Sequence, residues 1–283
     1  MKRKHHAVNQ LKFERNLLKA VEDEPEIIIG PGRKRFIISD THNGDGGPED
    51  GSADHILQMT HQVLPYYSRE DYSGIYNGDI ADLLETTRRR ILKHEPNQVL
   101  HWQLGDMKDP YWIPGNHDLK AYKFGKEPAF QNVKFCDAIR LVDSSGKLRG
   151  IISHGFRADW WNAGGLPTFL VKCIIPAWLV LQFFGAESEP DFDPDTIGGI
   201  ETDIEQVYFD TAKELELALI IGHTHRPKMI EAGKGLYVNS GSCVKEGMAF
   251  VVEIDGYEIR LVMWNETSRH VLKTKTLLPS TVA

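Results

Sequence analysis

Cysteine is scarce in this 283-residue sequence. There are three cysteines, Cys136, Cys173 and Cys243, and none of them belongs to a C-x-x-C pair. This number and spacing argue against a disulfide framework and against a cysteine-built metal site, and they suit a reducing compartment such as the cytoplasm. Basic charge is also in deficit, with 33 Lys and Arg against 40 Asp and Glu. A long nucleic-acid partner is therefore not expected, because phosphate contacts need a basic face.

Long apolar runs are missing as well. The longest candidate, residues 169–184, is shorter than the roughly 20 residues that a membrane span needs, and it contains Lys172 and Pro176. The basic start, residues 1–6, is not followed by an apolar run before Ile27, so we expect no secretory signal. We expect a cytoplasmic protein, and residues 169–184 suggest peripheral contact with a membrane.

Predicted strands alternate with predicted helices, and the last third of the chain is rich in strands. The pattern predicts strands at 35–39, 74–77, 111–113 and 218–221, and helices at 9–22, 54–67, 80–95 and 201–217. This arrangement favours an α/β domain in which two sheets pack together with helices outside. We divide the chain into an N-terminal helical extension, residues 1–34, and a main domain, residues 35–283, with an insertion at about 156–199.

Five short segments at the ends of predicted strands offer metal-ligand side chains. They are Asp40-Thr41-His42, Gly78-Asp79, Gly115-Asn116-His117-Asp118, His154-Gly155 and Gly222-His223-Thr224-His225. Residues i and i+2 of an extended chain point to the same side, so each D-x-H or H-x-H pair can face one point. Strand ends at one edge of a sheet are the usual place for a site, and the glycines permit close backbone approach.

The candidate ligands are too numerous for one transition metal and suit two ions that share a carboxylate. They are Asp40, His42, Asp79, Asn116, His154, His223 and His225. Nitrogen and oxygen donors without sulfur favour manganese, with iron or zinc as alternatives. Two such ions can hold a phosphoryl group and a water for in-line displacement. His117 stands between Asn116 and Asp118, and a histidine held by a carboxylate can protonate a leaving oxygen. We therefore assign catalytic roles to His117 and Asp118.

The motifs DTH, NGD, PGNHD, SHG and GHTHRP, in this order from Asp40 to Pro227, resemble the calcineurin-like metallophosphoesterase family. The resemblance implies a four-layer αββα sandwich and hydrolysis by a metal-bound hydroxide. It implies one ion on Asp40, His42 and His225, a second on Asn116, His154 and His223, with Asp79 bridging, and His117 as the proton-handling residue. GHTHRP and the long insertion resemble the UDP-2,3-diacylglucosamine diphosphatase branch, which usually has arginine at the position of His117.

Other polar residues have competing interpretations. Arg226, directly after the histidine pair, is a candidate for contact with a substrate phosphate, as is Asn116. Arg88, Arg89 and Arg90 form either a solvated helix face or an anion-binding rim. Asp82 and Glu85 are expected to cap or solvate the following helix, with substrate binding as the alternative.

The insertion at 156–199 is either a lid that holds an acyl chain or lies on a membrane, or an oligomer interface or extra core layer. The predicted function is hydrolysis of a phosphoester or diphosphate bond in a small molecule, with a UDP-linked acyl sugar or another lipid-like compound as a candidate substrate. The alternatives are a phosphodiesterase for a small nucleotide and a non-catalytic scaffold of the same fold. The presence of all seven ligand positions and His117 favours an enzyme, and a homo-oligomer remains an open alternative.

Overall fold

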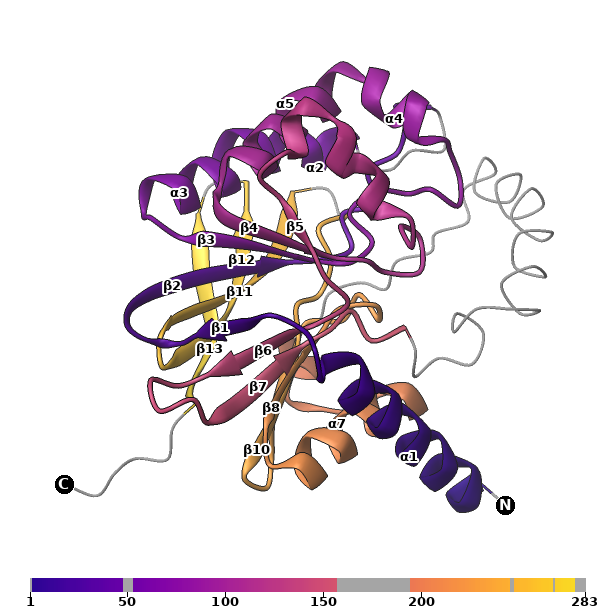
Figure 1. Cartoon of the computed structure of the whole chain (residues 1–283), viewed down its shortest axis with the longest axis vertical. Helices are drawn as coiled ribbons and strands as arrows, with labels where there is room; N and C mark the ends of the chain where they lie inside the picture. Colours follow the sequence, from indigo (N-terminus) through magenta and orange to yellow (C-terminus); the bar gives the residue numbers. More distant parts are fainter. Residues whose placement is uncertain (1, 48–52, 157–193, 245–246, 267, 278–283) are drawn as a thin grey trace.

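The computed structural model of the protein describes residues 2–47, 53–156, 194–244, 247–266 and 268–277 (Figure 1). In these residues, two β-sheets pack face to face and helices cover the outer face of each sheet (Figure 1). This confirms the predicted layered α/β fold. The apolar lid predicted around residues 169–184 lies outside the described residues.

One sheet has seven strands. They are β2 (Gly30–Ile38), β3 (Ser73–Asn77), β4 (Lys108–Ile113), β5 (Lys134–Phe135), β11 (Met248–Gly256), β12 (Glu258–Asn265) and β13 (Arg269–Thr276). Their order across the sheet is β13-β12-β11-β2-β3-β4-β5. Strands β2, β3, β4 and β5 are parallel, and β11 to β13 form an antiparallel meander on the other side of β2.

The other sheet has six strands. They are β1 (Glu26–Ile28), β6 (Ile139–Val142), β7 (Leu148–Ile152), β8 (Ala218–Ile221), β9 (Lys228–Ala232) and β10 (Gly235–Asn239). Their order is β1-β6-β7-β8-β10-β9, with β7, β8 and β10 parallel to one another. Strand β1, from the predicted N-terminal extension, pairs with β6 and so forms an edge of this sheet.

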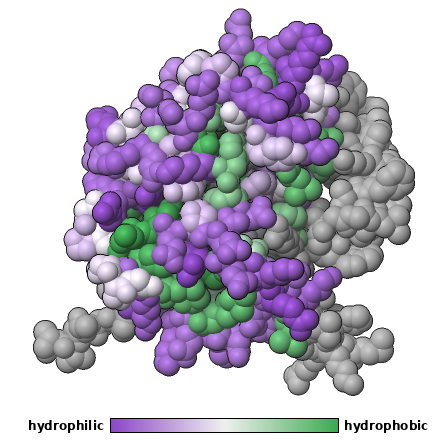
Figure 2. Space-filling model, viewed as in Figure 1, coloured by the Kyte–Doolittle hydropathy of each residue, from purple (hydrophilic) through white to green (hydrophobic). Residues whose placement is uncertain are grey.

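Three buried apolar clusters separate the four layers. The cluster between the sheets is dominated by β-branched side chains that suit strands on a buried face, such as Ile37, Ile75 and Ile220. A second cluster lies under helices α2 (Ala53–Gln58), α3 (Leu64–Arg69), α4 (Arg88–Lys93) and α5 (Glu95–Asp106). The third lies under α1 (Lys2–Val21) and α7 (Asp203–Leu215). The face of the molecule in Figure 2 is accordingly mostly hydrophilic, with hydrophobic residues in separate areas.

The predicted helix over residues 80–95 is wrong in its first half. Residues 80–87 form turns, because the Asp82 carboxylate accepts hydrogen bonds from the backbone N–H groups of Leu84 and Glu85, both at 3.0 Å. Helix α4 begins only at Arg88. Pro96, read as a stop, lies in the first turn of α5, where a missing N–H costs nothing.

Among the helices of the described residues, none combines the length and the hydropathy needed to cross a bilayer. Three further elements are short 3-10 turns, at Ala121–Lys126, Pro128–Phe130 and Pro194–Gly198, and a π-helical turn, Met59–Val63, connects α2 to α3.

Candidate metal centre

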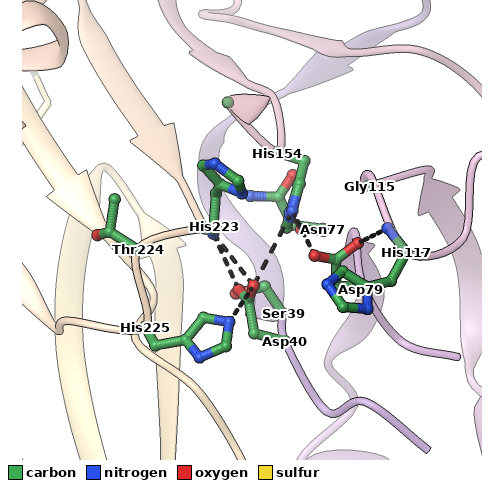
Figure 3. Close-up of polar contacts among 12 residues, drawn as sticks. Ser39, Asp40, Asn77, Asp79, Gly115, His117, His154, His223, Thr224 and His225 are labelled. Carbon is green, nitrogen blue, oxygen red and sulfur yellow. Dashed lines mark hydrogen bonds and ion pairs between the residues drawn. The ribbon is translucent and has the colours of Figure 1, made fainter. Parts of the chain in front are cut away.

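The loops that follow β2, β3, β4, β7 and β8 meet at one edge of the sandwich. They bring His, Asp and Asn side chains from five separate parts of the chain into one cluster (Figure 3). Among the described residues, possible ligand atoms lie within 4.8 Å of one another in two groups that match the sequence prediction: Asp40, His42 and His225, and Asp79, His154 and His223.

The first group is built around the buried Asp40. Nε2 of His225 lies 3.1 Å from Oδ1 of Asp40. Nε2 of His42 lies 3.2 Å from Nε2 of His225. The two ring nitrogens and the Asp40 carboxylate are close enough together to coordinate one cation.

The second group is built around Asp79, which is 1% exposed. Nδ1 of His154 donates to the backbone carbonyl of Asn77 at 2.7 Å, so Nε2 is the nitrogen that faces the site. That Nε2 atom lies 3.1 Å from Oδ2 of Asp79 and 3.9 Å from Oδ1 of Asp40. The two carboxylates therefore connect the two groups, as shared ligands of a pair of ions would.

Asn116 supplies an independent sign that the site is built for a cation. Its Oδ1 atom is buried and has no hydrogen-bond partner among the described residues. A buried acceptor without a partner is costly, and a bound metal ion would satisfy it. Its neighbour His117 donates its backbone N–H to Oδ1 of Asp79 at 2.8 Å, which places the Asn116 loop beside the shared carboxylate.

The electrostatics of the cluster also favour a bound cation. Burial alone would raise the pKa of Asp79, but the facing His154 and His117 bring it well below its usual range. Burial would lower the pKa of His154, yet Asp79 and Asp40 raise it to about 9. The pocket therefore stabilises positive charge, and a divalent cation fits this donor set better than protons do.

The ligand loops converge through an unusual backbone. Asp40, His42, Asp79, His223 and His225 all have φ between 43° and 71°, in the left-handed region. The expected extended i, i+2 geometry is therefore wrong for both pairs. Asp40 and His42 still share one group, whereas His225 belongs to that group and His223 to the other. A left-handed backbone conformation costs a non-glycine residue roughly 1–2 kcal/mol. Strained residues of this kind are concentrated at functional sites.

Two of the predicted glycines allow the close approach expected of them. A Cβ on Gly115 would lie 2.1 Å from Oδ1 of Asp79, and a Cβ on Gly222 would lie 2.6 Å from Oδ2 of Asp40. Because no side chain fits there, these glycines let the neighbouring backbone pack directly on the two carboxylates.

The expected role of Asp118 is corrected by the structure. Asp118 is fully buried, and its carboxylate accepts hydrogen bonds from the backbone N–H of Gly115 at 2.6 Å and of Ile80 at 2.9 Å, and from Nε1 of Trp112 at 3.1 Å. These bonds tie the loops after β3 and β4 together. We therefore assign Asp118 a structural role in holding these loops together, and not the role of orienting the His117 imidazole.

The carboxylate that holds His117 belongs to Asp82. Its Oδ2 atom lies 3.0 Å from Nδ1 of His117 and 3.3 Å from Nδ1 of His42. The sequence predicts that Asp82 caps or solvates a helix, with substrate contact as the alternative, and neither role includes His117. Its position three residues after Asp79 is the sequence feature that could have indicated this contact. Burial would lower the pKa of His117, but Asp79 and Asp82 raise it to about 9.

Arg226 is tied to the chain segment before α7. Its Nη1 atom lies 3.3 Å from Oε2 of Glu201, and the same oxygen accepts a hydrogen bond from Nζ of the buried Lys228 at 2.9 Å. This anchored arginine follows His225 directly, so it stays a candidate for substrate contact.

Solved structures that resemble this chain are distant in sequence. They include Yfce, a phosphoesterase from E. coli, with 16% identity, 87% of this chain and 100% of that chain covered, and a TM-score of 0.45. A dimetal phosphatase from Danio rerio has 12% identity, coverage of 86% and 99%, and a TM-score of 0.46. A novel archaeal phosphodiesterase has 16% identity, coverage of 81% and 99%, and a TM-score of 0.40. No curated protein is similar in sequence to the chain.

The family assignment rests on sequence. The profile of the calcineurin-like phosphoesterases matches residues 34–227, which include every candidate ligand described above and His117. The chain belongs to the calcineurin-like phosphoesterase family and is a metal-dependent phosphohydrolase.

Proposed function

We propose that this enzyme holds two divalent cations, manganese in the first instance, and hydrolyses a phosphoester or diphosphate bond in a small lipid-linked substrate such as a UDP-linked acyl sugar. The hydrolytic part is supported by one observation: Asp40 and Asp79 meet four histidines at one edge of the sandwich, where loops from both sheets converge. Asp40, His42 and His225 would hold one cation, Asn116, His154 and His223 the other, and Asp79 both. Such a pair supplies Lewis acidity toward a phosphoryl oxygen and lowers the pKa of water.

His117 would supply the proton for the leaving oxygen. Because Nδ1 of His117 faces Asp82, the ring presents Nε2 as the atom that can donate to a substrate. In the metal-free protein, burial lowers the pKa of His117, but Asp79 and Asp82 raise it to about 9. The Asp82 carboxylate thus favours the protonated imidazole that a general acid needs. Asp82 orients the ring, and Asp118 holds the loop that carries it.

Substrate contacts are proposed for Arg226 and Asn116. The guanidinium of Arg226 can bind a phosphate oxygen, and it forms an ion pair with Glu201 at 3.3 Å. The lipid-linked part of the substrate is supported by sequence: the apolar run 169–184 lies in the chain between the two candidate ligands His154 and His223. Leu119 and Tyr122, 45% and 59% exposed, add apolar surface directly after the loop of His117.

The test is hydrolysis of a metabolite panel in the presence of Mn²⁺, with products identified by mass. The panel contains UDP-diacylglucosamine, UDP-N-acetylglucosamine as its control without long acyl chains, cyclic dinucleotides and p-nitrophenyl phosphate. We expect the acylated nucleotide to be cleaved with the highest kcat/KM. Preference for a cyclic dinucleotide would replace the proposal with a nucleotide phosphodiesterase, and no turnover of any compound would favour the scaffold.

A second arm tests the insertion. Replacement of residues 169–184 by a Gly/Ser linker should reduce hydrolysis of the acylated substrate far more than hydrolysis of p-nitrophenyl phosphate. Equal losses would assign the segment to an interface or a core layer.

A further inference from the structure

Helix α1 differs in charge from the rest of the molecule. It contains six basic residues and one acidic residue, whereas the remaining chain contains 27 basic and 39 acidic residues. A single element of an acidic protein therefore carries a net charge of +5. Three of the basic residues, Lys2, Arg3 and Lys4, stand in its first turn. The helix extends outward from the sandwich with the N-terminus at its far end (Figure 1).

One face of α1 holds the helix on the body of the protein. Phe13, Leu17 and Val21, at helical spacing, are buried against α7 and the six-stranded sheet. The ring of Phe13 lies edge-on to that of Tyr208, with centroids 5.4 Å apart. Among the described residues, this face supplies the buried apolar contacts of α1, and the opposite side of the helix is exposed.

The outward face combines leucines with cations. Leu11 and Leu18 are 61% and 41% exposed, and they stand seven residues apart, which places them on one stripe of the helix. Lys12, Arg15 and Lys19 are exposed beside them. Lysine and arginine alone would suit any polyanion. A nucleic-acid phosphate backbone offers no apolar surface to two exposed leucines on the same stripe. The boundary between lipid headgroups and acyl chains does, and burying the leucines there removes their apolar surface from water, which is favourable.

We propose that α1 docks the enzyme on an anionic phospholipid surface, with Leu11 and Leu18 inserted between headgroups and with Lys12, Arg15 and Lys19 bound to lipid phosphates. The charge of α1 favours an anionic lipid surface as the partner. Because α1 is basic and the rest of the protein is acidic, a negative membrane would attract this helix and orient the protein with α1 toward the lipid. The proposal goes beyond the proposed function and does not depend on which substrate is cleaved.

The test is co-sedimentation of the whole 283-residue chain, loaded with Mn²⁺, with vesicles of phosphatidylcholine, with and without phosphatidylglycerol. We expect binding only to the anionic vesicles, and loss of binding as salt rises. The variant K12Q/R15Q/K19Q should lower the partition coefficient on the order of a hundredfold. The variant L11S/L18S should lower it about tenfold.

The matched control is K120Q/K123Q/K126Q, which removes the same charge from another exposed segment and should bind vesicles like the wild type. Hydrolysis of p-nitrophenyl phosphate by the α1 variants confirms that they are folded. Equal binding to both vesicle types, or equal loss in control and α1 variants, overturns the proposal. Binding of a DNA duplex or self-association that depends on α1, without vesicle binding, also overturns it in favour of that other partner.

Discussion

Oδ2 of Asp82 lies 3.0 Å from Nδ1 of His117. The same oxygen lies 3.3 Å from Nδ1 of His42, a candidate metal ligand. One buried acid therefore orients both the proposed proton donor and a residue of the metal centre, and it accounts for the raised pKa of His117 together with Asp79. Two predictions depend on this arrangement.

His117→Ala is expected to retain both cations and to lose roughly 10²–10⁴-fold in kcat on a substrate with a poor leaving group, because proton donation is lost. The loss on p-nitrophenyl phosphate should be much smaller, since p-nitrophenolate leaves without a proton. Metal content by mass spectrometry and kcat on an alkyl phosphate measure the two effects. An equal loss on both substrates would remove His117 from proton transfer.

Asp82→Asn is expected to move the alkaline limb of the kcat–pH profile to lower pH. The Asp82 charge raises the pKa of His117, so its removal lets the imidazole lose its proton earlier as pH rises. The profile should be measured with an alkyl phosphate. Asp118→Asn serves as the comparison: it should lower stability through the loops that Asp118 connects, but leave the position of that limb unchanged.

Metal binding near neutral pH is expected to release protons. In the metal-free protein, burial lowers the pKa of the candidate ligand His154, but Asp79 and Asp40 raise it from 6.5 to about 9. Because this folded-state pKa is raised, the contribution of His154 to stability is complete below pH 6.5 and is lost as pH rises through about 9. Chelated protein should therefore become less resistant to urea across this window.

Calorimetric titration of the chelated protein with Mn²⁺, in buffers of different ionisation enthalpy, measures the protons directly. Mn²⁺ should also restore the activity that chelation removes. Binding enthalpies that are identical in all buffers would contradict the proton-linked site.

Gly115→Ala is expected to lower activity by about a hundredfold or more, because a displacement of about 1 Å in a positioned group costs that much. The added Cβ would lie 2.1 Å from Oδ1 of Asp79, so either the loop or the carboxylate has to move. Gly199→Ala is the matched control, since its added Cβ meets nothing closer than 3.8 Å. Activity and metal content of the two variants should differ sharply, and similar behaviour would mean that the Asp79 carboxylate can be displaced without consequence.

Much of the fold and the cluster could be predicted from sequence, because both depend on local patterns. Short β-branched runs such as Arg35–Ser39 indicate buried strands, and the polar motifs follow them directly. What could not be predicted depends on contacts between distant loops. Asp82 leaves a helical pattern to meet His42 and His117, and Asp118 meets Trp112 and the backbone of Ile80. Contacts between residues on separate loops produce no periodic pattern in the sequence, so neither could be predicted from it.

The left-handed backbone of the candidate ligands also governs how an inactive form should be made for trapping a substrate. At Asp40 and Asp79, with φ of 52°, asparagine tolerates the torsion better than alanine or valine does. The substitutions Asp40→Asn and Asp79→Asn would therefore keep the shape of the loops while weakening their charge. A β-branched replacement would instead disfavour the left-handed torsion and change the conformation of the loop. The resulting loss of activity would then reflect a distorted loop rather than a missing ligand.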